Sequence, residues 1–401
     1  MAEQAKVPAI RFAGFTDPWE QRKFGELYRP VSEKNDVSFG RDKAISVANM
    51  YFNPAVYVTE DSYLATYNVM RLGDIAFEGN RSKRFAHGRF VENTIGDGIV
   101  SHVFKVFRHV GDNYDLSYWK HAINNEKLMK DVLTRSTKAS TMMHELVTAD
   151  FLEELTLVPS LNEQRAIGAA IDSIDNLITL HQRKYDKLVV FKKSMLEKMF
   201  PKDGESVPEI RFAGFTDPWE QRKFGELYRP VSEKNDVSFG RDKAISVANM
   251  YFNPAVYVTE DSYLATYNVM RLGDIAFEGN RSKRFAHGRF VENTIGDGIV
   301  SHVFKVFRHV GDNYDLSYWK HAINNEKLMK DVLTRSTKAS TMMHELVTAD
   351  FLEELTLVPS LNEQRAIGAA IDSIDNLITL HQRKLELLQN IKKSLLDKMF
   401  V

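Results

Sequence analysis

The sequence predicts an α+β protein made of two copies of one globular domain, each copy ending in a long helix. Residues 10–184 recur without a change as residues 210–384. This period is far longer than the roughly 20 to 50 residues of a solenoid unit, so each copy has the size of a domain. Such a repeat is either a recent duplication or an artificial tandem, and the complete lack of drift favours the second.

The first part of each copy combines short β-type runs with turn residues. Runs rich in β-branched and aromatic residues predict strands at residues 43–47, 55–58, 98–107 and 155–158. Residues 116–133, rich in Leu, Lys, Asn and Met, predict one helix between them. This mixture of elements predicts an α+β globule.

The end of each copy predicts a long helix with a coiled-coil seam. Ser160 and Glu163 have the spacing of a capping box, and apolar residues then recur at alternating steps of four and three. A period of about 3.5 residues is typical of a left-handed coiled coil. The seam positions are Ile167, Ile171, Ile174, Ile178, His181, Tyr185, Leu188, Lys192, Met195 and Met199, and in the second copy Ile367, Ile371, Ile374, Ile378, His381, Leu385, Leu388, Lys392, Leu395 and Met399.

The two helices are expected to pair with each other. The seam is kept where the copies differ, since Leu385 replaces Tyr185 and Leu395 replaces Met195. Pairing two like units by a two-fold operation makes the helices antiparallel and gives the chain a pseudo-two-fold symmetry. The predicted organisation is a domain at residues 1–159, a coiled-coil helix at 160–200, a linker at 201–209, a second domain at 210–359 and a C-terminal coiled-coil helix at 360–401.

Composition excludes several classes of protein. The chain has no Cys, which excludes disulfides and Cys-ligated metal centres, and its formal net charge is −1. No apolar run approaches the ~18 residues of a membrane span. We therefore expect a cytoplasmic protein without membrane contact.

No catalytic motif is found in the sequence. There is no phosphate-binding Gly-rich loop ending in Gly-Lys-Ser/Thr, and no Gly-x-Ser-x-Gly nucleophile elbow. The tetrapeptide Asn53-Pro54-Ala55-Val56 lacks the second Pro and the aromatic residue that amino-methyltransferases use to hold their target amino group. The His residues are scattered without close metal-ligand spacing, so they are interpreted as ordinary surface or core residues. We predict neither a catalytic residue nor a metal site.

Two polar loops are the candidate functional segments. Residues 81–89 carry four Arg or Lys side chains and one His without an acid, and residues 135–141 combine two cations with several hydroxyl groups. Such groups contact phosphates, and Arg can also read guanine in the major groove. The alternative for each loop is a solvated hairpin tip or loop. Residues 49–53 add amide and aromatic groups, for which core packing is the alternative to base stacking.

Four ordered motifs carry a resemblance to a known family. Residues 12–26, 70–77, 158–167 and 392–400 resemble the specificity subunit of type I restriction–modification systems. The resemblance implies two target-recognition domains joined by antiparallel helices, each domain reading half of a bipartite site on double-stranded DNA. It also implies docking of two methyltransferase subunits, with restriction subunits in the larger complex. S-adenosylmethionine, ATP and Mg²⁺ would then be cofactors of the partner subunits, and this chain would bind none.

The chain departs from that family in one respect, because its two domains are identical and not different. The target is therefore expected to be a split palindrome. A structural coiled-coil scaffold without base-specific reading is the alternative function. With the resemblance, the predicted DNA contacts are Arg81, Lys83, Arg84, His87, Arg89, Arg135, Lys138, Ser140 and Thr141, and in the second copy Arg281, Lys283, Arg284, His287, Arg289, Arg335, Lys338, Ser340 and Thr341.

Overall fold

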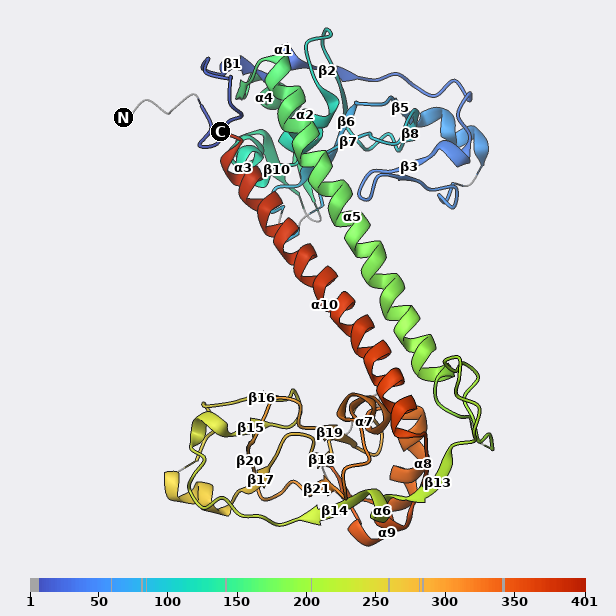
Figure 1. The fold of residues 1–401 in the computed structure, drawn as a ribbon. Helices are drawn as coiled ribbons and strands as arrows, with labels where there is room; N and C mark the ends of the chain where they lie inside the picture. The colour runs from blue at the N-terminus through green and yellow to red at the C-terminus, as the bar shows by residue number, and fades with distance from the viewer. Residues whose placement is uncertain are drawn as a thin grey trace. The chain divides into compact units, whose positions relative to one another are not determined.

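The computed structural model describes residues 7–58, 60–80, 82–83, 85–140, 143–202, 204–258, 260–280, 282, 285–340 and 343–401. The chain divides into two compact units, one made of Met1–Gln182 with Arg383–Val401 and the other of Arg183–Gln382. Each unit holds one globular domain, the beginning of the long helix that follows it and the end of the other long helix (Figure 1).

A four-stranded antiparallel sheet forms the centre of the first domain. Its strand order is β2 (Tyr28–Val31), β9 (Val106–His109), β6 (Ile75–Glu78) and β7 (Arg89–Glu92). The sheet packs against α2 (Leu116–Ile123) through large aromatic side chains that are almost fully buried. The buried aromatic residues of this core are Trp19, Phe24, Tyr28, Phe77, Phe90, Phe107, Tyr118, Trp119 and Phe151, together with Phe400 from the C-terminus.

Smaller elements surround this sheet. The strand pairs are β1 (Glu20–Lys23) with β12 (Leu155–Val158), β3 (Ile45–Ser46) with β4 (Tyr51–Phe52), β5 (Asn68–Met70) with β8 (Gly98–Val100), and β10 (Thr137–Ala139) with β11 (His144–Leu146). The short helices are α1 (Phe24–Leu27), α3 (Glu126–Ser136), α4 (Thr148–Glu153) and the 3₁₀ turns η1 (Arg41–Lys43) and η2 (Asp61–Thr66).

The second domain repeats the same elements. They are β13 (Glu220–Lys223), α6 (Phe224–Leu227), β14 (Tyr228–Val231), η3 (Arg241–Lys243), β15 (Ile245–Ser246), β16 (Tyr251–Phe252), η4 (Asp261–Thr266), β17 (Asn268–Met270), β18 (Ile275–Glu278), β19 (Arg289–Glu292), β20 (Gly298–Val300), β21 (Val306–His309), α7 (Leu316–Ile323), α8 (Glu326–Ser336), β22 (Thr337–Ala339), β23 (His344–Leu346), α9 (Thr348–Glu353) and β24 (Leu355–Val358).

The predicted strands agree with the structure in part. The strand at 155–158 is confirmed, and the run at 98–107 is divided into β8 and β9 by a turn in which Phe104 N–H donates to Ser101 O at 3.0 Å. The strand at 55–58 is wrong. Asn53 and Pro54 begin a turn there, closed by a 3.2 Å bond from Val56 N–H to Asn53 O, and the strand lies earlier, in β4.

The single helix predicted at 116–133 is also two helices. The side chain of Asn125 accepts hydrogen bonds from Lys127 N–H at 3.0 Å and Leu128 N–H at 3.2 Å, which makes it the N-cap of a new helix, α3. The break at Asn124 and Asn125 sets α2 and α3 at different positions against the core.

The long helices are α5 (Leu161–Lys198) and α10 (Leu361–Lys398), with the predicted start. Ser160 caps α5 by accepting from Glu163 N–H at 3.4 Å. The carboxylate of Glu163 does not complete the capping box, because it accepts from Arg11 at 2.7 Å and from the Trp19 indole at 3.1 Å. The predicted seam positions in both helices are buried or half-buried, whereas the off-seam Leu177 and Leu180 are exposed.

The two long helices are antiparallel within each unit. In the first unit Ile167 and Ile171 of α5 share a core with Met399, while further along α5 Asp175 meets Lys392 at 2.6 Å. Residue numbers therefore rise along one helix as they fall along the other. In the second unit the matching pair is Lys192 with Asp375 at 2.5 Å, which explains why a Lys stands at a seam position. Among the described residues, no helix is both long enough and apolar enough to cross a membrane.

Candidate functional site

The two candidate loops lie side by side in each domain. The first connects β6 with β7. The second is not a loop over most of its length, because its described residues form the end of α3, strand β10 and then Ser140. His144 N–H donates to Gly79 O at 2.8 Å, and the rings of His87 and His144 are 4.9 Å apart. In the second domain the bond from His344 to Gly279 is also 2.8 Å. The charged segments at residues 81–89 and 135–140 thus contribute to one surface.

Gly79 makes this junction possible. A Cβ atom at this position would lie 2.1 Å from His144 O, a backbone atom that cannot move aside alone. A larger residue would therefore separate the two hairpins. The sequence contains no signal that would pair Gly79 with its partner across the surface.

The β3–β4 turn is a third segment of the same surface. The Arg89 guanidinium donates from Nε to Glu78 Oε2 at 2.7 Å and from Nη2 to Ala48 O at 2.5 Å, so it ties this turn to the β6–β7 hairpin. Met50 has a left-handed backbone with φ of 46°, and Asn49 beside it is exposed. Tyr51 is also exposed, so core packing, which was the alternative to base stacking, does not apply to it.

The predicted cations differ in their surroundings. Arg135, near the end of α3, is bound to Glu154 through Nε at 2.8 Å and Nη2 at 2.5 Å, as Arg89 is bound to Glu78. Lys83 and Lys138 are exposed and have no ion pair with a described residue. At the β10–β11 tip, Ser140 N–H donates to Met143 O at 2.9 Å.

The second domain repeats these surroundings for Arg289, Arg335 and the exposed Lys338. His287 lies 5.0 Å from His344 between ring centres, and Ser340 closes the tip on Met343. Seven predicted contacts lie outside the residues that the structure describes, so their geometry is not part of this surface. They are Arg81, Arg84, Thr141, Arg281, Lys283, Arg284 and Thr341.

Two pockets flank the β6–β7 loop of the first domain. One, of about 250 Å³, lies between Lys83, residues 85–89 and the junction of α2 with α3. The other, of about 310 Å³, lies between the two hairpins and is lined by Asn80, Lys105 and Ser140 among others. The surface is therefore hollowed on both sides of the loop.

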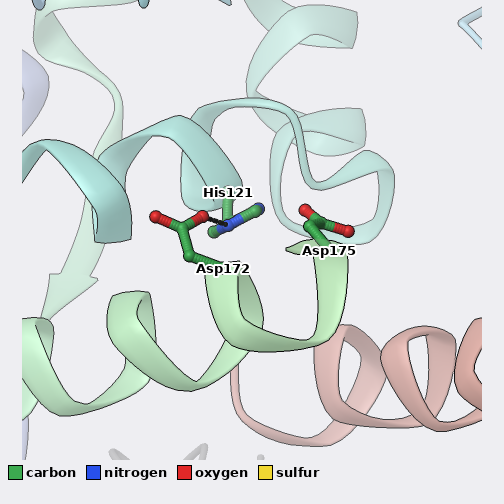
Figure 2. Close-up of side chains that lie close together, drawn as sticks. All are labelled: His121, Asp172 and Asp175. Carbon is green, nitrogen blue, oxygen red and sulfur yellow. Dashed lines mark hydrogen bonds and ion pairs between the residues drawn. The ribbon is translucent and has the colours of Figure 1, made fainter. Parts of the chain in front are cut away.

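A polar network joins each domain to its helix pair, with a buried histidine and half-buried carboxylates. His121 of α2 lies between Asp172 and Asp175 of α5, with its Nε2 atom 2.8 Å from Asp172 Oδ1 (Figure 2). The sequence did not predict this group, because His121 is distant in the sequence from Asp172 and Asp175. The candidate ligand atoms all lie within 4.8 Å of one another, as a metal site requires.

The charges of this network are nevertheless balanced by lysines. Lys120 lies 2.5 Å from Asp172, and Lys392 of α10 lies 2.6 Å from Asp175. Burial lowers the pKa of His121, which favours its neutral form. Burial alone would raise the pKa of Asp172, but hydrogen bonds from Lys120, Ser117 and His121 together lower it. The network is therefore best described as an ion-paired anchor that joins α2, α5 and α10.

A second polar cluster is buried in the core of each domain. Glu92 Oε2, the Tyr28 hydroxyl and His109 Nε2 are buried without a hydrogen-bond partner among the described residues. Burial raises the pKa of Glu92 to about 9 and lowers the pKa of His109 to about 3. Both side chains are therefore neutral at pH 7.

Two known proteins are similar to this chain in sequence. No family model matches it. It is 24% identical over 295 residues to the type I restriction enzyme MjaVIII specificity subunit of Methanocaldococcus jannaschii, covering 68% of this chain and 67% of that protein. It is also 24% identical over 308 residues to the putative type I restriction enzyme MjaX specificity subunit of the same organism, covering 71% and 66%.

Two solved structures share the fold. The HsdS subunit from Thermoanaerobacter tengcongensis is 16% identical with a TM-score of 0.50, covering 97% of this chain and 98% of that one. The type I restriction–modification system S subunit from M. genitalium is 13% identical with a TM-score of 0.56, covering 98% and 99%.

The fold defines a class of protein in which two like α+β domains are each continued by a long helix. With the sequence relatives, the resemblance to the specificity subunits of type I restriction–modification systems is confirmed. Both relatives are named as specificity subunits, which supports the prediction of a non-catalytic chain.

Proposed function

We propose that this chain is the non-catalytic subunit that reads DNA sequence in a type I restriction–modification complex. Each domain reads one half of a bipartite site through its three-segment surface. The observation that carries the proposal is the meeting of the two polar loops, held by the bond between Gly79 and His144 and repeated in both domains. An assembly scaffold would have no need for two polar loops joined in this way.

Different groups on this surface suit different parts of the DNA. Exposed ammonium groups such as Lys83 and Lys138 suit phosphates, whereas the exposed amide of Asn49 suits base edges. Arg89 uses Nε in its ion pair with Glu78 and Nη2 in the bond to Ala48 O, whereas Arg135 uses both atoms in its ion pair with Glu154. In both residues Nη1 is left to meet DNA in a fixed orientation. In this assignment the carboxylates Glu78 and Glu154 are positioning groups.

The helix pair is the proposed docking site for two methyltransferase subunits and, through them, the restriction subunits. Apolar side chains off the seam remain exposed in this chain, as an interface requires. They include Leu177, Leu180, Val190, Phe191, Leu377, Leu380 and Leu387. S-adenosylmethionine, ATP and Mg²⁺ act in those partners, so the isolated chain transfers no methyl group.

Genome-wide mapping of methylated bases in a host carrying the complete system tests the proposal. Two identical reading surfaces require a target whose halves are reverse complements, separated by unread base pairs. A reproducible motif with unrelated halves would contradict two equivalent readers. Methyl transfer by the purified chain alone would contradict its non-catalytic role. A scaffold, in contrast, would show no salt-dependent DNA binding of its own.

A further inference from the structure

An open groove lies beside the reading surface in the first unit, between α3 and the end of α10. Its volume is about 930 Å³. Four lysines line it, two from each helix, and Leu396 is its one large apolar residue among those described. The lining residues are Asn125, Glu126, Lys127, Lys130, Gln389, Lys392, Lys393, Leu396 and Asp397.

Three of the four lysines keep their charge available. Lys130 and Lys393 are exposed and have no ion pair with a described residue. Lys127 donates to the backbone carbonyl of Asp397 at 3.4 Å and has no ion pair with a described residue. Lys392 is different, because its ammonium group is paired with Asp175.

A specific contact holds the two walls of the groove together. The Asn125 side chain, which caps α3, donates from Nδ2 to Leu396 O of α10 at 2.9 Å. In the second unit Asn325 donates to Leu196 O at 3.1 Å, which places Lys327 and Lys330 of α8 beside the end of α5.

The groove continues the reading surface. Asn125, Glu126 and Lys130 line both the groove and the smaller pocket beneath the β6–β7 loop, where Lys83 and Arg89 also lie. Lysine and arginine side chains therefore lie along both pockets, from Lys83 to Lys393, and they outnumber the two lining acids Glu126 and Asp397. A duplex that contacts the loop can extend along these side chains.

The sequence of the two helix ends gives independent support. Residues 185–200 and 385–400 are where the two copies differ, yet Lys-Lys-Ser stands at 192–194 and again at 392–394. Lys193 and Lys393 are exposed, so core packing does not explain their retention.

We propose that this lysine groove holds the phosphate backbone of duplex DNA where it continues past the half-site. The inference rests on the proposed function and adds a sequence-independent contact to it. Exposed ammonium groups without an apolar anchor suit a polyanion, whereas a stable protein interface is centred on buried aromatic or aliphatic residues.

The test measures DNA affinity against salt for the full chain in complex with its modification subunits. The variants are Lys193→Gln with Lys393→Gln, and Lys130→Gln with Lys330→Gln, on a mixed-sequence duplex. Each lost phosphate contact reduces the slope of log K against log salt by about 0.9, so each pair should reduce it by about two. The matched control, Lys184→Gln with Lys384→Gln, removes two exposed helix charges outside the groove and should leave the slope unchanged.

Three results would overturn the inference in different ways. Slopes equal to the control would show that the groove does not meet DNA. Loss of the modification subunit during co-purification, with an unchanged slope in the remaining complex, would assign the groove to a protein partner. Wild-type complex without salt-dependent DNA binding would contradict the proposed function itself.

Discussion

Each unit contains two polar clusters, one half-buried and one buried, and they differ in how their charges are compensated. The anchor network around His121 pairs both of its carboxylates with lysines, whereas the core cluster of Glu92, Tyr28 and His109 leaves polar atoms without partners. The first joins three helices, and the second lies inside one domain behind the sheet. Charged side chains are therefore present where α2, α5 and α10 must be held in register. Inside the domain, Glu92 and His109 are neutral.

The largest expected effect comes from the unpaired cluster. Glu92 has a pKa of about 9 in the folded chain against an ordinary 4.5, so between these values the folded chain keeps a proton that the unfolded chain loses. As pH rises, stability should therefore fall by about 1.4 kcal/mol per unit and per domain, and above about pH 6.5 the opposite titration of His109 no longer offsets this fall. Glu92→Gln with Glu292→Gln should remove this loss in urea unfolding from pH 7 to pH 8.

His109 provides the internal control for that experiment. Its pKa of about 3 means that stability is lost as pH falls below about 6.5, where the unfolded chain takes up a proton. This acid-side loss should remain in the Gln variants. Equal slopes for wild type and variants above pH 7 would show that Glu92 is ionised in the folded chain.

The paired cluster should respond to a single broken partner. Asp172→Asn leaves Lys120 without its carboxylate, and we expect about 2 kcal/mol of destabilisation. This is less than for a fully buried pair, because both side chains are half-buried and solvent screens the charge that is left. Lys120→Met in the same chain should recover much of it. Urea unfolding of the two single variants and the double variant measures the coupling, and additive losses would argue against an ion-paired anchor.

The junction of the two hairpins at Gly79 and His144 is a close backbone approach. Gly79→Ala with Gly279→Ala places a Cβ against His144 O, and we expect about 2 kcal/mol of destabilisation per domain and a loss of target preference. Gly40→Ala is the control, since its Cβ would meet only the flexible Asp42 side chain at 3.0 Å. Unchanged discrimination between target and non-target duplexes would separate the junction from reading.

The sequence predicted the long helices well because they follow a local pattern. A seam every 3.5 residues fixes which face of α5 is buried, and Ser160 fixes its start. Short elements were predicted less well, since Asn125 divides one helical pattern into α2 and α3 through its side-chain cap.

Contacts between distant segments could not be read from the sequence. The approach of Gly79 to His144 and the clamp of Arg89 on Ala48 join residues that no short spacing connects. For the same reason the His121 network was missed, because its carboxylates come from another helix. The sequence shows the composition of these segments, but it does not show which of them are in contact.

The smallest expected effect compares the two copies directly. Lys138 and Lys338 are exposed at the same place on β10 and β22, and they have identical neighbours in the sequence. If each contacts one phosphate, Lys138→Gln and Lys338→Gln should each reduce the salt slope by about one, and the double variant by about two. Base preference should stay the same in all three, because phosphate contacts carry no sequence information. Unequal single effects on a palindromic duplex would show that the two identical domains do not meet DNA in equivalent ways.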